Sequence, residues 1–143
     1  MNLVIDASVV IKFYVPEILS DRAERLLAKV EKKDIDLLAP DLIYPEVGNI
    51  LWKKNRLKEL TRSEAEEITD AILSLPLKIE ASRSLLPLTV DIAIAYGITV
   101  YDASYLSLAK VYETTMITAD RKLADVLAKT DLKDSVIWLG SYK

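Results

Sequence analysis

The chain has 143 residues, 51% of them hydrophobic, and a formal net charge of −3, which predicts one globular domain over residues 1–143 without a global attraction for nucleic acid. No apolar run reaches the ~18 residues of a membrane span and the N-terminus lacks the pattern of a signal peptide, so we expect a cytoplasmic protein. Cysteine and histidine are absent, which excludes disulfides, Cys-His and Ser-His nucleophilic catalysis, and zinc sites with sulfur or nitrogen ligands.

The first part of the chain predicts two strands with a helix between them. The apolar run "NLVI" at 2–5 is typical of a buried strand, and it ends at Asp6. Residues 20–33 place apolar side chains at helical spacing, with Ser20 as the expected N-cap. A second strand is predicted at 36–39, where a proline follows.

The middle of the chain predicts two helices. The first covers 41–56, with Pro45 either at its first position or within its first turn, where the missing N–H does least harm. The second covers 61–75, and Thr61 and Glu64 have the spacing of a capping box at its start.

The remaining predicted elements alternate between helix and strand. In chain order they are a helix over 88–96 closed by Gly97, an extended stretch at 98–100, a helix from Asp102 to about residue 112, a strand at 115–118, a helix over 120–129 and a strand at 135–139. Short apolar strands that alternate with helices predict an α/β fold with a mostly parallel central sheet and helices on both faces.

Acidic residues stand where strands end or helices begin. Asp6 and Asp120 leave strands, Asp102 opens a helix, and Glu46 lies near the start of another. Because the carboxyl ends of parallel strands share one edge of the sheet, we expect these four carboxylates to meet there. Each aspartate taken alone could also be an ordinary helix cap or first-turn acid.

Helix capping explains Glu46 least well. It shares a helical stripe with apolar residues such as Leu42 and Ile50, which predicts a half-buried carboxylate, and no lysine or arginine lies within one turn before it. A cation from outside the chain would supply a partner. Clustered carboxylates repel unless a cation lies among them, and all-oxygen ligation favours Mg²⁺ or Mn²⁺. The pattern indicates a magnesium-dependent phosphoester hydrolase.

Four segments resemble, in this order, the acidic motifs of PIN-domain ribonucleases: "VIDASVVIKF", "PDLIYPEVGNILWK", "YDASYLSLA" and "TADRKL". The length of the chain is similar to that of the VapC toxins of type II toxin–antitoxin pairs. The resemblance assigns the family's four acids to Asp6, Glu46, Asp102 and Asp120. It assigns supporting hydroxyls to Ser8 and Thr118.

Two further side chains have open roles next to these motifs. Ser104, like Ser8, could be an ordinary first-turn hydroxyl or a contact to a water on the metal. Asp125 could be an outer acid of the site or part of a solvated helix face.

The resemblance implies an endoribonuclease that cuts single-stranded or loop RNA and is held in check by a cognate antitoxin. Asp6 and Asp102 would be the main ligands of Mg²⁺, with Mn²⁺ as a substitute, while Glu46 and Asp120 would complete the cage or hold a second ion. Water activated by the ion would attack phosphorus in line and leave a 5′-phosphate and a 3′-hydroxyl, without help from the ribose 2′-OH. A homodimer, and an antitoxin segment across the acidic edge, are also implied.

Basic and aromatic residues near the acids have two interpretations each. The basic ones could contact the RNA backbone or be solvated helix charges: Lys12, Arg121, Lys122 and the cluster at 52–58. The aromatic ones could stack on bases, although packing is the simpler assumption: Tyr14, Tyr44, Tyr101 and Tyr105.

Two other Mg²⁺-binding classes have related patterns. A phosphatase of the haloacid dehalogenase type needs a second aspartate two residues after the first, where this chain has Ser8. A receiver-like signalling module needs an acceptor aspartate after a middle strand and a lysine after a late one. The predicted strands at 36–39 and 135–139 supply neither.

Overall fold

The computed structural model describes residues 1–143 and contains five strands and seven α-helices. The strands are β1 (Asn2–Ile5), β2 (Asp36–Pro40), β3 (Leu77–Glu80), β4 (Met116–Thr118) and β5 (Val136–Trp138). The helices are α1 (Ala7–Val10), α2 (Ser20–Glu31), α3 (Ile43–Arg56), α4 (Arg62–Ser74), α5 (Ser82–Tyr96), α6 (Val100–Val111) and α7 (Arg121–Ala128). Three short 3₁₀ segments are η1 (Ile11–Phe13), η2 (Lys133–Ser135) and η3 (Leu139–Ser141).

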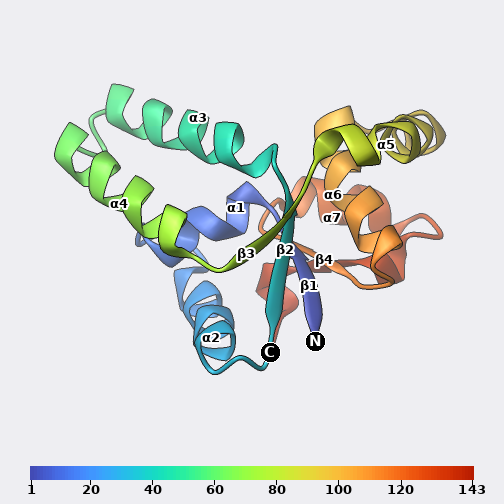
Figure 1. Ribbon diagram of the computed structural model, residues 1–143, viewed down its shortest axis with the longest axis horizontal. Helices are drawn as coiled ribbons and strands as arrows, with labels where there is room; N and C mark the ends of the chain where they lie inside the picture. Colours follow the sequence, from blue (N-terminus) through green and yellow to red (C-terminus); the bar gives the residue numbers. More distant parts are fainter.

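The five strands form one sheet in the order β3-β2-β1-β4-β5, and every neighbouring pair is parallel. Helices α1 to α4 lie on one side of the sheet and α5 to α7 on the other (Figure 1). The predicted α/β fold is therefore confirmed. The strand order reverses between β1 and β4, which creates the switch point where ligands bind in such folds. Receiver domains have the order 2-1-3-4-5, so the topology argues against that alternative.

Helix α6 is the central helix of the core. Every residue from Ala103 to Ala109 is buried, and the helix contacts β1, β2 and β4. Burial on all sides explains why α6 has no clear polar face. It also fixes the first turn of α6, where Asp102 lies, at the carboxyl edge of the sheet.

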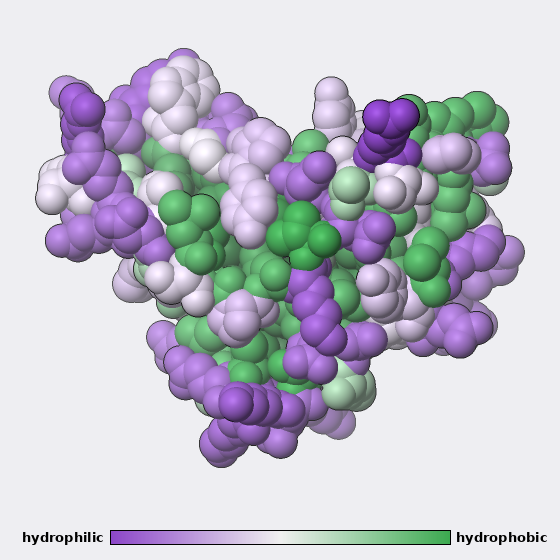
Figure 2. Space-filling view, in the orientation of Figure 1, coloured by the Kyte–Doolittle hydropathy of each residue, from purple (hydrophilic) through white to green (hydrophobic).

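A V-shaped hollow opens between two projecting parts of the molecule. Helices α3 and α4 pack against each other and form one arm, and α5 forms the other (Figures 1 and 2). The strands point into this hollow with their carboxyl ends (Figure 1). No single helix is long and apolar enough to cross a membrane; α5 and α6 pass that test only as a pair bent by 115°.

Several local predictions are confirmed by the helix ends. Thr61 and Glu64 form a full capping box on α4, Gly97 ends α5 in the left-handed conformation at φ 64°, and Pro45 lies in the first turn of α3. The predicted N-cap at Ser20 is wrong: Leu19 holds that position, and the Ser20 hydroxyl donates to the carbonyl of Val15 instead.

The second half of the chain differs from the prediction in three places. Edge strand β3 was not predicted, because its side chains are largely exposed and carry no apolar run. Helix α5 starts six residues earlier than the predicted 88 and contains Pro87. Pro87 has no N–H to donate to the carbonyl of Arg83, four residues earlier. Both residues are exposed, so water can bond to that carbonyl instead. Residues 98–100 are not a separate extended stretch, because α6 already begins at Val100.

Candidate active site

Asp6 is the most buried acid at the switch point, with 7% of its surface exposed. It follows β1 and caps α1: its Oδ1 accepts hydrogen bonds from the Ser8 hydroxyl at 2.5 Å and from the Val9 amide at 3.2 Å. Its Oδ2 accepts a hydrogen bond from the Thr118 hydroxyl at 2.5 Å. Both carboxylate oxygens are thus held in fixed positions.

The two hydroxyls also connect Asp6 to the loop after β4. The Ala119 amide donates to Ser8 Oγ at 2.9 Å, and the Asp120 amide donates to Thr118 Oγ1 at 3.1 Å. Asp120 in turn caps α7 by accepting a hydrogen bond from the Leu123 amide at 3.1 Å. The network joins the ends of β1 and β4, which are neighbours in the sheet, so the backbone at Asp120 is held beside Asp6.

Glu46 is half-buried on α3, as the sequence predicted, but its partner belongs to the chain. The Tyr105 hydroxyl donates to Glu46 Oε1 at 2.5 Å. Tyr105 is buried on α6, one turn after Asp102. Because Tyr105 is packed in the core, its hydroxyl orients the Glu46 carboxylate.

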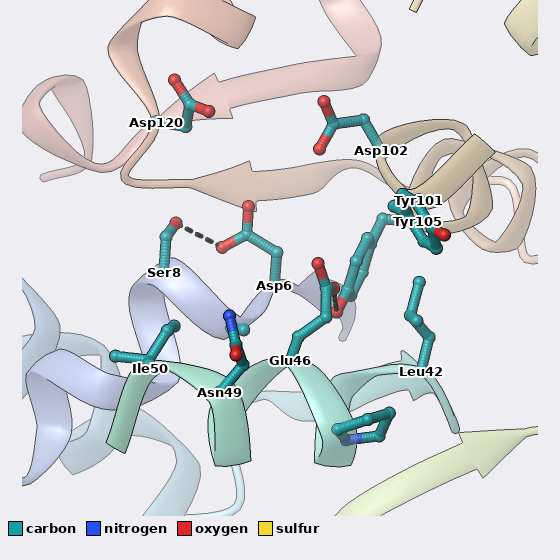
Figure 3. Close-up of a pocket in the computed structure, with 12 residues that line it drawn as sticks. Asp6, Ser8, Leu42, Glu46, Asn49, Ile50, Tyr101, Asp102, Tyr105 and Asp120 are labelled. Carbon is teal, nitrogen blue, oxygen red and sulfur yellow. Dashed lines mark hydrogen bonds between the residues drawn. The ribbon is translucent and has the colours of Figure 1, made fainter. Parts of the chain in front are cut away.

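The four predicted acids line one pocket of about 460 Å³, together with Ser8 and Asn49. Their carboxylates come from four different segments and turn toward a common space (Figure 3). The structure therefore brings together all four acids that were expected at this edge.

Burial and mutual repulsion perturb three of these carboxyl groups. Burial raises the pKa of Asp6 to about 6, despite the hydrogen bonds from Ser8 and Thr118, and the charge of Glu46 adds to the increase. Burial also raises the pKa of Glu46, and the charge of Asp102 adds to this increase. Burial raises the pKa of Asp102 in the same way, and the charge of Asp120 adds to it. Glu46, Asp102 and Asp120 thus each make a neighbouring acid harder to ionise, a situation that a bound cation would relieve.

The donor set of the pocket fits a hard cation, since its polar lining groups are carboxylate, hydroxyl and amide groups. No three of the acids stand close enough in their present rotamers to hold one ion together. Asp120 is exposed and Asp102 is half-buried, so these two side chains have room to turn toward Asp6.

Several residues proposed from the sequence lie outside this pocket. Ser104 lines a neighbouring cavity instead of the carboxylate pocket. Lys12 forms an ion pair with Glu17 at 3.0 Å and is largely buried. Arg121 lies over the ring of Trp138 at 4.3 Å, and Lys122 is exposed on α7.

Asp125 and the other three tyrosines also have defined positions. Asp125 is exposed and lies 3.7 Å from Arg121, so it belongs to a solvated helix face. Tyr101 lines the carboxylate pocket, whereas Tyr14 and Tyr44 do not.

Two residues of the pocket were missed or undervalued. The packing assumption for Tyr105 was incomplete, because its hydroxyl has a specific acceptor; its position three residues after Asp102 on one helix was the available signal. Asn49 lies three residues after Glu46 on α3 and could have been found by the same spacing.

The all-parallel α/β fold and the four carboxylates at its switch point together fit the class of metal-dependent phosphoester hydrolases. The family model of the PIN domain matches residues 3–129, so the chain belongs to the PIN-domain family. The predicted resemblance is thereby confirmed.

Individual relatives are similar over most of their length. The chain is 35% identical over 127 residues to Ribonuclease VapC3 of Pyrobaculum aerophilum, which covers 87% of this chain and 94% of that protein. The crystal structure of PAE2754 from P. aerophilum superposes with a TM-score of 0.70 and 25% identity, over 99% of this chain and 85% of that one. VapBC2 of Rickettsia felis, crystallised with a promoter DNA fragment, has a TM-score of 0.65 and 14% identity, over 96% and 98% of the two chains.

Proposed function

We propose that this protein is a Mg²⁺-dependent endoribonuclease toxin of a type II toxin–antitoxin pair. The observation that carries the proposal is the pocket at the switch point, where four acids from four segments meet and where burial and neighbouring carboxylates raise the pKa of Asp6, Glu46 and Asp102. The similarity to Ribonuclease VapC3 supports RNA as the substrate class.

Asp6 and Asp102 would be the main ligands of Mg²⁺, and Glu46 and Asp120 would complete the cage. The ion would supply Lewis-acid stabilisation of the phosphate charge and lower the pKa of water. Ser8 and Thr118 keep Asp6 oriented through their hydrogen bonds. 

Glu46 could also act as the general base. Tyr105 engages its Oε1, while Oε2 makes no hydrogen bond within the chain. With its raised pKa, Glu46 can accept the proton of the attacking water at Oε2. In-line attack at phosphorus would then leave a 5′-phosphate and a 3′-hydroxyl.

Cleavage assays test the proposal directly. The purified protein should cut RNA with Mg²⁺ or Mn²⁺, EDTA should stop it, and Asp102→Asn should lower the rate by at least about 10³-fold. Asp125→Asn is the matched control, because Asp125 is an exposed aspartate outside the pocket. Cleavage of a circular RNA identifies an endonuclease, and full activity in EDTA would refute the metal mechanism.

A cognate antitoxin is the expected partner, and the resemblance to a VapBC complex supports it. The pocket combines four acids with an open hollow, so an arginine or lysine of the antitoxin could enter and pair with carboxylates in place of the ion. Inhibition by such a peptide should then weaken as the Mg²⁺ concentration rises.

A homodimer is part of the same proposal. The predicted helices around 42–51 and 64–75 carry more apolar residues than one core face can bury, and some of them are exposed in the structure, among them Tyr44 and Leu73. Val90 and Ile94 are also exposed, one turn apart on α5. Figure 2 shows hydrophobic surface at the α5 end of the molecule. Exposed apolar side chains on these helices favour contact with a second copy of the chain. Ile94→Lys should shift the protein to monomer in light scattering, and a monomeric wild type at micromolar concentration would refute the dimer.

A further inference from the structure

We infer that Arg121 and Trp138 form a second phosphate subsite, which binds an RNA phosphate beside the scissile one. This inference rests on the proposed function and extends it to the way in which the substrate is held. The guanidinium of Arg121 lies over the indole of Trp138, 4.3 Å from the centre of the ring. A guanidinium held on an aromatic face presents its N–H donors in a defined orientation, and its planar fork matches the oxygens of a phosphate.

The two residues lie beside the carboxylate pocket, at the carboxyl edge of the sheet. Trp138 ends β5 and is paired with Thr118 at the end of β4. The hydroxyl of Thr118 donates to the carboxylate of Asp6, and neighbouring strands are only about 4.8 Å apart. Arg121 directly follows Asp120, which lines the pocket. The subsite therefore borders the place where the scissile phosphate would bind.

The donors of Arg121 are available to a ligand. The acid paired with it, Asp125, lies 3.7 Å from its Nε, which is beyond hydrogen-bond distance. Both side chains are well exposed, at 65% and 67%, and an ion pair in that setting contributes little. Lys12 and Lys54, by contrast, are largely buried and each lies 3.0 Å from Glu17. A phosphate can therefore reach the guanidinium of Arg121, whereas those two lysines are already occupied.

Trp138 carries a cost for folding, which points to a use for its ring. Its Nε1 is buried and has no hydrogen-bond partner. Such an N–H destabilises a fold, and phenylalanine would supply an aromatic ring at this position without that cost. Gly140 leaves room for the indole, because a Cβ there would collide with the ring. Tryptophan binds a cation on its face more strongly than phenylalanine does, so holding Arg121 is the use that the contacts support.

A second arginine–tryptophan stack provides a matched control. Arg56 lies over the ring of Trp52 at 5.0 Å, at the end of α3. It is about 15 Å along the helix from Glu46, and neither member of this stack lines the carboxylate pocket. The same local contact is thus present at a place from which the acids are remote.

Binding of labelled single-stranded RNA tests the inference when every variant also carries Asp102→Asn, which prevents cleavage. Fluorescence anisotropy is measured in Mg²⁺ over a series of salt concentrations. Arg121→Gln should weaken binding about tenfold and reduce the slope of log Kd against log salt by about 0.7, the value for one phosphate contact of a single strand. Arg121→Lys keeps the charge but not the stacked fork, so it should restore the slope and only part of the affinity. Arg56→Gln should leave both unchanged.

A double-mutant cycle tests the positioning role of Trp138. Trp138→Leu should weaken binding about two- to fivefold when Arg121 is present, and it should have no effect beside Arg121→Gln. Trp138→Phe should weaken binding less and leave the protein at least as stable to urea, because the buried N–H is gone. Effects that simply add would show that Trp138 contacts the RNA by itself and would overturn the pairing.

RNAs in which one phosphate is replaced by a neutral methylphosphonate test the position of the subsite. The effect of Arg121→Gln should vanish when one phosphate beside the scissile one is neutral, and it should persist when the scissile phosphate is neutral. The opposite pattern would place Arg121 in the carboxylate pocket and overturn the inference, as would equal affinity and slope for Arg121→Gln and Arg56→Gln. Absence of cleavage by the wild type, with binding that still depends on Arg121, would refute the proposed nuclease but not the phosphate subsite.

Discussion

Neutralising Asp6 should change the stability of the metal-free protein in a way that depends on pH. Burial raises the pKa of this carboxyl group to about 6 in the folded chain, compared with an ordinary value of 3.8. Between these two values the folded state holds a proton that the unfolded state has lost. Stability therefore falls as the pH rises through this window and stays constant above it. The substitution Asp6→Asn removes this loss.

The magnitude follows from the same values. The gap between 3.8 and about 6 corresponds to about 3 kcal/mol of stability lost above pH 6. Asparagine is an equally good N-cap, so the bond to Val9 is kept. Its amide cannot accept the hydrogen of Thr118 as Oδ2 does, which costs about 1 kcal/mol. We expect Asp6→Asn to be about 1 kcal/mol less stable than wild type at pH 4 and about 2 kcal/mol more stable at pH 7.5.

Urea unfolding in EDTA, followed by the fluorescence of the two tryptophans, measures this difference at each pH. The two stability curves should cross between pH 4 and pH 6. The slope of the free energy against urea should be equal for both proteins, which would show that the unfolded states are comparable. Mg²⁺ at neutral pH should stabilise the wild type and leave the variant nearly unchanged. A difference in stability that stays constant from pH 4 to pH 8 would refute the reasoning.

Three other predictions concern residues with defined partners. Asp102→Asn should unfold at a temperature roughly 2–4 °C higher than wild type in EDTA, because repulsion from Asp120 disappears; a metal-independent decrease would make Asp102 an ordinary first-turn acid. Tyr105→Phe removes a hydrogen bond that lowers the pKa of Glu46, so the loss of cleavage rate should be roughly threefold larger at pH 6 than at pH 8; an equal loss at both would contradict this role. Glu17→Gln should destabilise the fold by about 1 kcal/mol at pH 7. Burial opposes the charge of Glu17, but hydrogen bonds and charges from its two lysine partners lower its pKa. The difference in unfolding free energy between wild type and Glu17→Gln, measured by urea unfolding, should therefore close as the pH falls below 4.5. A difference that persisted below that pH would contradict this explanation.

The parts of the site that depend on local sequence could be predicted. A buried strand followed by an acid and a helix is encoded in a few consecutive residues, and this holds for Asp6 and for Asp120. Parallel topology then brings such strand ends to one edge. The half-burial of Glu46 could be predicted as well, because helical spacing alone shows that it shares a face with apolar residues.

The parts that depend on distant packing could not be predicted. From the sequence, Lys12 could contact RNA or be a solvated helix charge; in the structure Glu17 binds both Lys12 and Lys54, two residues far apart in the sequence. No periodicity in one segment reveals such a triple contact. The bond between Tyr105 and Glu46 is of the same kind, since it joins α6 to α3 across the sheet edge. In each case the sequence identified the charged residue but not the partner that neutralises or orients it.

The repeated tripeptide Asp-Ala-Ser shows how helix position separates the roles of identical residues. Asp6 is the N-cap of α1, so Ser8 stands in the first turn and its hydroxyl reaches back to the Asp6 carboxylate. Asp102 is instead the third residue of α6, because Thr99 takes the capping role and accepts a hydrogen bond from the Asp102 amide. Ser104 therefore lies beyond the first turn, where successive residues are rotated by about 100° around the axis, and it faces the neighbouring cavity. A shift of three residues in the helix start thus converts the serine from an orienting partner of the acid into a lining residue of a separate cavity.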